Sequence, residues 1–243
     1  MKQAFDILLL GASYGSLLAT KLALAGHNAK LICLPDEVNL INKEGTLVRM
    51  PVKGREGLYD ISSKTLSGKI EAIGPDQVKA DEFDLAVLAM QEPQYRSSDI
   101  KNVLKDLAAA KIPCMSIMNM PPSTYLKRID GLDTTQYRDS YADASVWDQL
   151  DPKLMTLCSP DPQAFRPPDE PINVLQVRLP TNFKAARFEF DEHTAILEKL
   201  ENDIEAARFD TGNGLVELPV KLRVHRSIFV PMAKWCMLLA GNY

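Results

Sequence analysis

FDILLLGASYGSLLATKLALAGHNAKLICL, residues 5–34, decides the fold of this chain. Residues 5–10 form a run that is apolar apart from Asp6, which is typical of a strand buried on both faces of a parallel sheet. Residues 16–25 carry apolar side chains at helical spacing and stop at Gly26, a helix C-terminal signal. Residues 29–34 are a second short apolar run. The segment therefore predicts one βαβ unit, with a turn that contains two glycines between the first strand and the helix.

The alternation of strands and helices continues for about 120 residues, which is typical of a doubly wound α/β sheet. It predicts a short helix at 38–42, short strands and hairpins at 46–74, a buried strand at 83–90, a helix at 100–110 and a further strand at 113–118. We therefore predict a Rossmann-like fold in which parallel strands form the sheet and helices cover its two faces.

The pattern changes in the second half of the chain. Residues 159–171 contain five prolines, which predicts a rigid extended connection or an active-site lid. A surface helix is expected at 192–208 and a more apolar helix at 222–243, where the sequence ends. We expect a Rossmann-like domain over residues 1–185. Residues 186–243 are expected to begin a C-terminal helical substrate domain that is incomplete at Tyr243 or has been lost.

Composition and charge narrow the classes of partner. The chain has 243 residues, 46% hydrophobic content and a net charge of −4, so it lacks the basic surface expected of a nucleic-acid binder. The longest apolar stretch, 228–241, is interrupted by Pro231 and Lys234 and is too short to span a bilayer. The basic residues between 221 and 226 are expected to form a solvated face, and the alternative is that they attract an acidic substrate. Small molecules and other proteins are the expected partners, and an apolar last helix predicts a homodimer or aggregation if the helical domain is missing.

The four cysteines are far apart in the sequence, at positions 33, 114, 158 and 236. None of them forms the close pair that a zinc ribbon or a redox dithiol needs, and the three histidines are isolated. We therefore expect no metal site. The cysteines are interpreted as reduced core residues, which predicts a cytoplasmic location.

A cofactor site is predicted at the turn between the first strand and the first helix, formed by Gly11, Ala12, Ser13, Tyr14, Gly15 and Ser16. Backbone N–H groups and the positive end of the helix would meet a pyrophosphate at this place. The spacing is G-x-x-x-G rather than G-x-G-x-x-G, so the middle glycine of the dinucleotide fingerprint is missing. The alternative is a tight turn that binds no ligand.

The end of the second strand bears on the choice between NAD and NADP. In dinucleotide folds an acidic residue there favours the free 2′-hydroxyl of the adenosine ribose, and an arginine accommodates a 2′-phosphate. Here the sequence is Leu34-Pro35-Asp36-Glu37, whose carboxylates would repel a 2′-phosphate and so favour NAD. Lys43 or Arg49 could fold back to the same place, which leaves NADP open.

Five segments, taken in order, carry a resemblance to a known family. They are the glycine turn, INKEGTLVRM at 41–50, VLAMQEPQ at 87–94, IMNMPP at 117–122 and KWCMLLAGN at 234–242. Their order and spacing resemble those of the ketopantoate reductase (2-dehydropantoate 2-reductase) family and its opine-dehydrogenase relatives. The resemblance implies an NAD(P)-binding Rossmann domain followed by a helical domain.

The resemblance also implies cofactor contacts at the ends of two later strands. A lysine and a glutamine three residues apart follow the fourth strand in the family, and Gln91 and Gln94 occupy these positions, so the lysine is replaced. Asn119 matches an asparagine on the nicotinamide side of the site, although Met120 replaces the glycine that usually follows. The resemblance therefore implies that Gln91, Gln94 and Asn119 bind the cofactor.

The catalytic residues implied by the resemblance lie in the last segment. The family's K-x3-N-x3-N pattern is matched by Lys234 and Asn242, with Leu238 in place of the first asparagine. Independently, Lys234 stands in a markedly apolar run, and burial of an ammonium group disfavours its charged form, which suits a proton donor. The alternative is a lysine whose stem covers apolar surface while its head stays in water.

The sequence thus predicts an NAD(P)-dependent oxidoreductase that moves a hydride to a 2-oxo acid or an imine. Lys234 would protonate the acceptor and Asn242 would orient it, while the cofactor supplies the hydride. The alternative is a catalytically decayed nucleotide-binding or interaction protein with a Rossmann fold. Three departures from the family pattern favour it: the missing glycine, Gln91 and Leu238.

Overall fold

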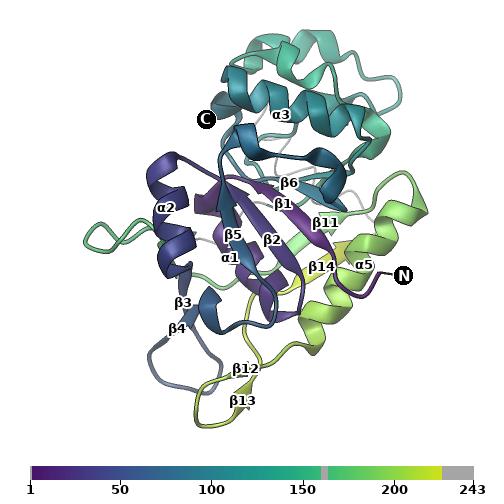
Figure 1. Cartoon of the computed structure of the whole chain (residues 1–243). Helices are drawn as coiled ribbons and strands as arrows, with labels where there is room; N and C mark the ends of the chain where they lie inside the picture. Colours follow the sequence, from purple (N-terminus) through teal and green to yellow (C-terminus); the bar gives the residue numbers. More distant parts are fainter. Residues whose placement is uncertain (1, 160–163, 226–243) are drawn as a thin grey trace.

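A computed structural model describes residues 2–159 and 164–225 of the chain. Its centre is a six-stranded parallel sheet with the strand order β5-β2-β1-β6-β7-β8 (Figure 1). The strands are β1 (Asp6–Leu10), β2 (Asn28–Ile32), β5 (Ile70–Ile73), β6 (Leu85–Leu88), β7 (Cys114–Ser116) and β8 (Met155–Leu157). This order is that of a doubly wound Rossmann-like sheet, so the predicted fold class is confirmed.

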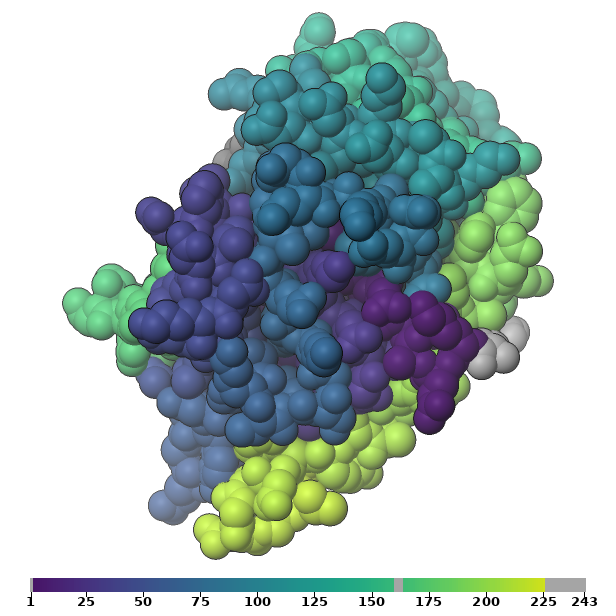
Figure 2. Space-filling view, in the orientation of Figure 1, coloured from purple at the N-terminus to yellow at the C-terminus, as the bar shows by residue number. Residues whose placement is uncertain are grey.

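The helices are α1 (Ala12–Leu24), α2 (Pro35–Glu44), α3 (Ser98–Ala109), α4 (Ser123–Leu126) and α5 (Asp191–Ala206). Short 3-10 helices join them: η1 (Ser63–Thr65), η2 (Pro75–Gln77), η3 (Ala80–Glu82), η4 (Glu92–Arg96), η5 (Thr134–Ser140), η6 (Ala144–Trp147) and η7 (Pro152–Leu154). In Figure 2, the residues near 100–150, in teal, form the upper part of the molecule, and the yellow-green residues beyond 190 run from its right side to its lower edge.

Strand β1 explains why the sheet is covered on both faces. Ile7 and Leu9 belong to one buried cluster, which they share with Leu17 and other side chains of α1. Leu8 belongs to a second cluster with α3 and Trp147. Because successive side chains of a strand point to opposite faces, an unbroken apolar run requires cover on each face.

A second, four-stranded sheet has the order β4-β3-β10-β9. Its strands are β3 (Leu47–Pro51), β4 (Leu58–Ser62), β9 (Ala164–Phe165) and β10 (Val174–Val177). β3 and β4 form the antiparallel hairpin expected in this region, whereas β10 returns from more than 100 residues away to pair in parallel with β3. The proline-rich segment thus contributes β9 to this sheet, and its function as a lid stays a prediction.

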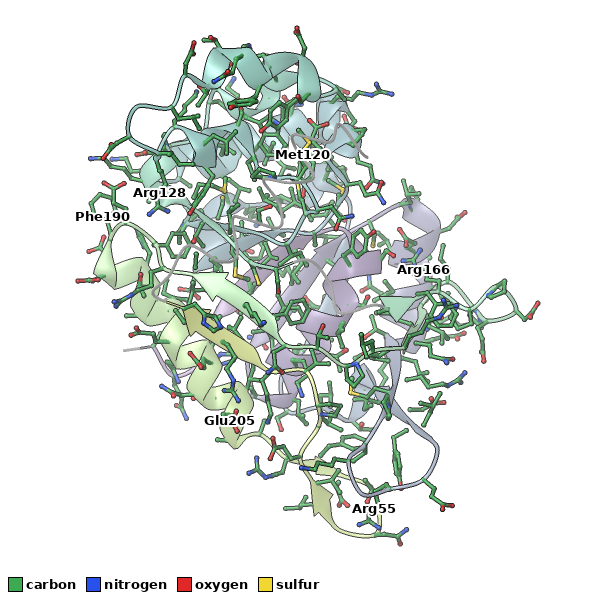
Figure 3. All side chains as sticks on the ribbon, turned by 180° about the vertical axis from the view of Figure 1, so that it is seen from behind. Arg55, Met120, Arg128, Arg166, Phe190 and Glu205 are labelled. Atoms are coloured by element: carbon green, nitrogen blue, oxygen red, sulfur yellow. The ribbon has the colours of Figure 1, made fainter. Side chains whose placement is uncertain are left out.

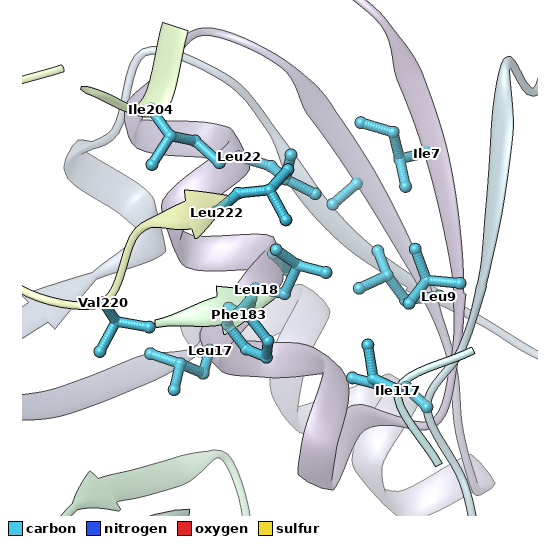
Figure 4. Close-up of a cluster of buried hydrophobic side chains, with 14 of the residues drawn as sticks. Ile7, Leu9, Leu17, Leu18, Leu22, Ile117, Phe183, Ile204, Val220 and Leu222 are labelled. Atoms are coloured by element: carbon cyan, nitrogen blue, oxygen red, sulfur yellow. The ribbon is translucent and has the colours of Figure 1, made fainter. Parts of the chain in front are cut away.

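The last described residues pack onto the first cluster. β11 (Phe183–Ala186) pairs in parallel with β14 (Leu222–His225), and a small hairpin, β12 (Phe209–Asp210) with β13 (Leu215–Val216), precedes β14. Figure 4 shows Leu222 and Ile204 beside Leu22 of α1. The predicted domain boundary after residue 185 falls within β11 and stays a prediction.

Two expectations for this region are wrong. Leu222–His225 is a strand rather than the start of a helix, because this segment pairs in parallel with the edge of β11. Lys221 does not lie on a solvated face: it is 5% exposed, and its Nζ is 3.0 Å from a carboxylate oxygen of Glu217. A short apolar run does not by itself distinguish a strand from a helix. In residues 2–159 and 164–225, no helix is both long and apolar enough to cross a membrane.

Candidate functional site

The sheet changes its winding direction between β1 and β6. These strands are parallel neighbours, and their last residues, Leu10 and Leu88, are paired in register. The chain leaves β1 into α1 on one face and leaves β6 toward η4 and α3 on the other. In open α/β sheets, ligands bind in the crevice outside the carboxyl ends of the strands at such a switch point.

Gly11 is the residue that connects β1 to α1. Its φ of +113° is a conformation that L side chains rarely adopt. A Cβ at this position would lie 2.7 Å from Cγ of Met90 and 2.8 Å from the carbonyl oxygen of Ala89. The backbones that follow β1 and β6 therefore approach each other so closely that only glycine fits between them.

The predicted glycine turn is shorter than expected, because α1 already begins at Ala12. Residues 12–16 thus form the first turn of the helix instead of a loop, since the single residue Gly11 is enough to reverse the chain. By helix geometry, the N–H groups of Ala12, Ser13 and Tyr14 have no acceptor in the preceding turn. The side chain of Ser13 is exposed, so this helix end is open to an anion.

Gly15 and Ser16 face the protein interior. A Cβ on Gly15 would lie 3.3 Å from both Leu9 and Leu31, so this glycine allows α1 to lie close to β1 and β2. Ser16 is 6% exposed, and its hydroxyl donates to the carbonyl oxygen of Ala12 at 2.5 Å. Both residues shape the N-terminal part of the helix, and direct contact with a cofactor stays a prediction for them.

The structure brings Gln91 and Tyr14 together. The side-chain amide of Gln91, three residues after the end of β6, donates to the Tyr14 hydroxyl at 3.3 Å. Gln94 uses its side-chain oxygen to accept the backbone N–H of Gln91 at 2.9 Å, so it holds the turn after β6. Asn119 follows β7 and is partly buried. Lys234 and Asn242 lie outside the described residues.

Sequence reasoning missed two residues that hold the turn after β6. Glu92 is 4% exposed and accepts the Ala142 N–H at 3.0 Å and the Trp147 indole N–H at 3.3 Å. Burial raises the pKa of the Glu92 carboxyl, and the two hydrogen bonds oppose this shift. The hydroxyl of Tyr95, fully buried, accepts the Met90 N–H at 3.2 Å. The partners of Glu92 are about 50 residues away, so no local pattern indicates them.

At the end of β2, the carboxylate of Glu37 is engaged within the protein, which differs from the expectation that the carboxylates here would face the cofactor. Glu37 is 7% exposed; one of its oxygens accepts the Leu34 N–H at 3.2 Å, and the other lies 2.5 Å from the guanidinium of Arg166. Burial raises the pKa of the neighbouring Cys33 thiol to about 12, with a further increase from Glu37 and an opposing effect of Arg166. Arg166 therefore lies at the end of β2, although no pattern in the sequence indicates this contact.

The two cations suggested from the sequence are engaged elsewhere. Arg49 on β3 contacts Asp60 at 2.7 Å and Glu170 at 2.9 Å. Lys43 is in the last turn of α2, at the end remote from β2, and lies 3.4 Å from Glu44. In the part of the chain that the structure describes, no group of three or more His, Cys, Asp or Glu side chains is arranged to hold a metal ion.

The arrangement at the switch point fits a dinucleotide. Gly11 lets two backbones meet there, the N-terminus of α1 offers N–H groups to a diphosphate, and Gln91 and Asn119 follow the next two strands. No protein-family model matches the chain, and no curated protein matches it in sequence.

Solved structures resemble the fold. A ketopantoate reductase from Ralstonia solanacearum MolK2, described as putative, matches 93% of this chain and 61% of its own with 13% identity and a TM-score of 0.60. A D-mandelate dehydrogenase in ternary complex with NADH and anilino(oxo)acetate matches 95% of this chain and 59% of its own, with 14% identity and a TM-score of 0.55.

A third structure, 2-dehydropantoate 2-reductase from Methylococcus capsulatus, matches 98% of this chain and 65% of its own with 13% identity and a TM-score of 0.53. The chain thus spans about three fifths of the length of these three proteins. In fold, this chain is similar to the ketopantoate reductases.

Proposed function

We propose that this chain binds a nicotinamide adenine dinucleotide at the carboxyl edge of its parallel sheet and acts as an NAD(P)-dependent oxidoreductase. The observation that carries the proposal is the switch point itself, where Gly11, the open N-terminus of α1 and Gln91 meet between β1 and β6. The similarity of the fold to reductases that include an NADH complex supports it.

Each part of the site has a separate task in this proposal. The N–H groups of Ala12, Ser13 and Tyr14 hold the diphosphate, and Gly11 leaves room for it. Gln91 and Asn119 lie on the nicotinamide side. When bound in its reduced form, the nicotinamide supplies a hydride from C4.

We propose a 2-oxo acid or an imine as the acceptor. Hydride addition to the carbonyl or imine carbon leaves electrons on the oxygen or nitrogen, and the Lys234 ammonium donates the proton that completes a 2-hydroxy acid or an amine. Asn242 orients the acceptor. The complex of D-mandelate dehydrogenase with NADH and anilino(oxo)acetate supports the oxo-acid class.

The first experiment is calorimetric titration of the full chain with NAD⁺ and NADP⁺, followed by assays with NADH and NADPH. The acceptors are ketopantoate, and pyruvate with and without an amino acid. We expect dinucleotide binding and oxidation of the reduced cofactor that depends on the acceptor. Lys234→Met is expected to lower turnover by at least about 100-fold without changing dinucleotide affinity.

A second candidate is a dinucleotide-binding protein that has lost catalysis. The observation that favours it is the neutral Gln91, hydrogen-bonded to Tyr14, at the position where the family pattern has a lysine. Binding of a dinucleotide without turnover of any acceptor would support this candidate. Absence of binding to either dinucleotide would reject both.

A further inference from the structure

The chain between β7 and β8 folds as the short helix α4 and the 3-10 helices η5, η6 and η7. We propose that its segment 141–147 is a positioning clamp, which fixes the turn after β6 and the turn after β7 relative to each other and so holds Gln91 and Asn119 at the nicotinamide. This inference rests on the proposed dinucleotide function. It assigns to the clamp segment, residues 141–147, a role in positioning rather than in contact with the reacting atoms.

The parallel sheet does not itself place Gln91 against Asn119. The pairing of β6 with β7 ends at Leu88 and Ser116. Gln91 and Asn119 each lie three residues beyond this last pair. Neighbouring strands are held in register only where their backbones pair, so the separation of these two side chains depends on contacts outside the ladder.

Glu92, the residue after Gln91, connects the turn after β6 to the clamp segment. One Glu92 oxygen accepts the Ala142 N–H at 3.0 Å, and the other accepts the Trp147 indole N–H at 3.3 Å. Glu92 is 4% exposed and Trp147 is fully buried. Hydrogen bonds to a carboxylate are stronger than those between neutral groups, so one side chain binds the segment firmly near both of its ends.

Tyr95 adds a second connection to the same turn. Its ring centroid lies 5.1 Å from that of Trp147, and the planes are inclined by 50°. Its hydroxyl accepts the Met90 N–H at 3.2 Å. Met90 and Glu92 are the two neighbours of Gln91 in the chain, so Gln91 is held through the residue on each side.

Tyr141, at the start of the clamp segment, connects it to the turn after β7. The Tyr141 hydroxyl donates to the carbonyl oxygen of Pro121 at 2.8 Å, and Pro121 lies two residues after Asn119. Met120, between these two, belongs to the same buried cluster as Tyr141 and Trp147, and Figure 3 shows it in the upper part of the molecule. The segment therefore contacts both turns from within one cluster.

Buried hydrogen bonds suit this task. They have preferred lengths and directions, and inside a protein they are stronger than in water. A placement error of about 1 Å at a reacting centre can lower a rate about 100-fold. The side chain of Gln91 is exposed and that of Asn119 is partly buried, so both remain accessible to a ligand while the groups that position them are sealed.

The test compares ligands that differ in the nicotinamide. Calorimetry on the full chain would measure NADH against ADP-ribose, and NADPH against 2′-phospho-ADP-ribose. In the unchanged protein we expect the dinucleotide to bind at least about fivefold more tightly than its fragment, because Gln91 and Asn119 contact the nicotinamide.

Tyr141→Phe removes one hydroxyl and leaves the buried ring in place. It should weaken the dinucleotide by about three- to tenfold and leave the fragment within about twofold, because the diphosphate is held at α1. Turnover at saturating substrate should fall about tenfold. A role limited to stability would lower the thermal midpoint without changing the ratio of the two affinities.

Trp147→Phe tests the connection to the other turn. It removes the indole N–H that bonds to Glu92 and keeps an aromatic ring beside Tyr95. We expect the same selective loss of dinucleotide affinity. Because both bonds hold one segment, the double variant should lose less than the product of the two single losses. If Trp147→Phe fails to fold, Tyr141→Phe alone decides.

Tyr59→Phe is the matched control. It makes the same chemical change on β4 in the second sheet, which carries neither Gln91 nor Asn119. Both affinities should stay as in the unchanged protein. Thermal unfolding of each variant without ligand would show that the fold is retained.

The outcomes separate this inference from the proposed function. Equal binding of dinucleotide and fragment by the unchanged protein, or a folded Tyr141→Phe that loses neither or both equally, would overturn the clamp and leave dinucleotide binding intact. If none of the four ligands binds, both the proposed function and this inference fail.

Discussion

The polar groups at the two ends of helix α1 have opposite environments: exposed at one end and buried at the other. At the N-terminus, the first N–H groups follow Gly11, and the side chain of Ser13 is exposed at the carboxyl end of β1. At the other end, Lys21 is 1% exposed, and its Nζ donates to the carbonyl oxygens of Leu218 and Pro219 at 3.4 and 3.1 Å. One helix thus has an open end and a sealed end.

The sealed end keeps its polar groups within the protein. Burial, with a smaller contribution from the charge of Lys221, lowers the pKa of Lys21 to about 7. Close by, Nδ1 of the buried His27 accepts the Phe5 N–H at 3.1 Å, and its Nε2 lies 3.0 Å from Asp203. Burial lowers the pKa of His27 as well.

This difference between the two ends of α1 indicates which of them can form a ligand site. A polar group matched inside the protein supports the fold, because an unmatched one would cost stability. Donors left at an accessible helix end remain available to a ligand. Strongly shifted pKa values are therefore not a sufficient guide to the functional site here, since Lys21 lies at the end of α1 opposite to Gly11.

The largest effect is expected at the open end, from Gly11→Ala. The new Cβ would collide with Met90 and the Ala89 carbonyl and would be forced into a positive φ, so we expect a loss of about 2–4 kcal/mol in the free energy of unfolding. Dinucleotide affinity should fall at least about 100-fold. Urea unfolding and calorimetry measure the two effects.

Gly26→Ala is the control for backbone strain alone. Gly26 also has a positive φ, +87°, but no heavy atom lies within 4 Å of a Cβ placed there. We expect a loss of about 1 kcal/mol and unchanged dinucleotide binding. If the two alanine variants were equally stable and bound equally well, the close contact at Gly11 would have no functional meaning.

The second-largest effect is expected at the sealed end, and it is a pH dependence of the free energy of unfolding. Lys21 titrates near 10.5 when unfolded and near 7 when folded, so between these values the unfolded state binds more protons. The free energy of unfolding should therefore rise with pH from 7 to 8.5, by about 1 kcal/mol per unit. Above this window, the Cys33 and Cys114 thiols, whose pKa values burial raises to about 12, act in the opposite direction.

Lys21→Met should abolish this slope, because the variant has no ammonium group at this position to lose a proton. The comparison variant is Lys30→Met, since Lys30 is 34% exposed and lies 3.2 Å from Glu82. It should keep the slope. Urea unfolding at several pH values measures how the free energy of unfolding depends on pH. If this dependence persisted in Lys21→Met, it would contradict the interpretation of the sealed end.

The smallest effect is expected from Ser13→Glu at the open end. A carboxylate in the first turn of α1 is stabilising in the free protein by up to about 1 kcal/mol, because it meets the positive helix end. The same charge should weaken dinucleotide binding by about five- to tenfold through repulsion of the diphosphate. Ser13→Gln should change neither. A Ser13→Glu protein that binds NAD⁺ and NADP⁺ as tightly as the wild type would place the diphosphate elsewhere.

The apolar pattern was enough to predict the first βαβ unit and the strands near 85 and 114. It left out β8, because Met155–Leu157 follows a region of 3-10 turns in which strands and helices no longer alternate. It also gave a helix at 222, where the structure has a strand, because the choice depends on pairing with the edge of β11. Whether such a segment forms a strand or a helix depends on partners that are remote in the sequence.

The sequence by itself determined the winding of the sheet and the place of Gly11, because runs of apolar residues and a glycine between a strand and a helix act locally. Only the tertiary structure decided that Lys21 is buried and that Arg166 meets Glu37, 129 residues earlier in the chain. The physical reason is that burial and ion pairing depend on which segments pack together, and packing joins residues whose separation leaves no periodic signal.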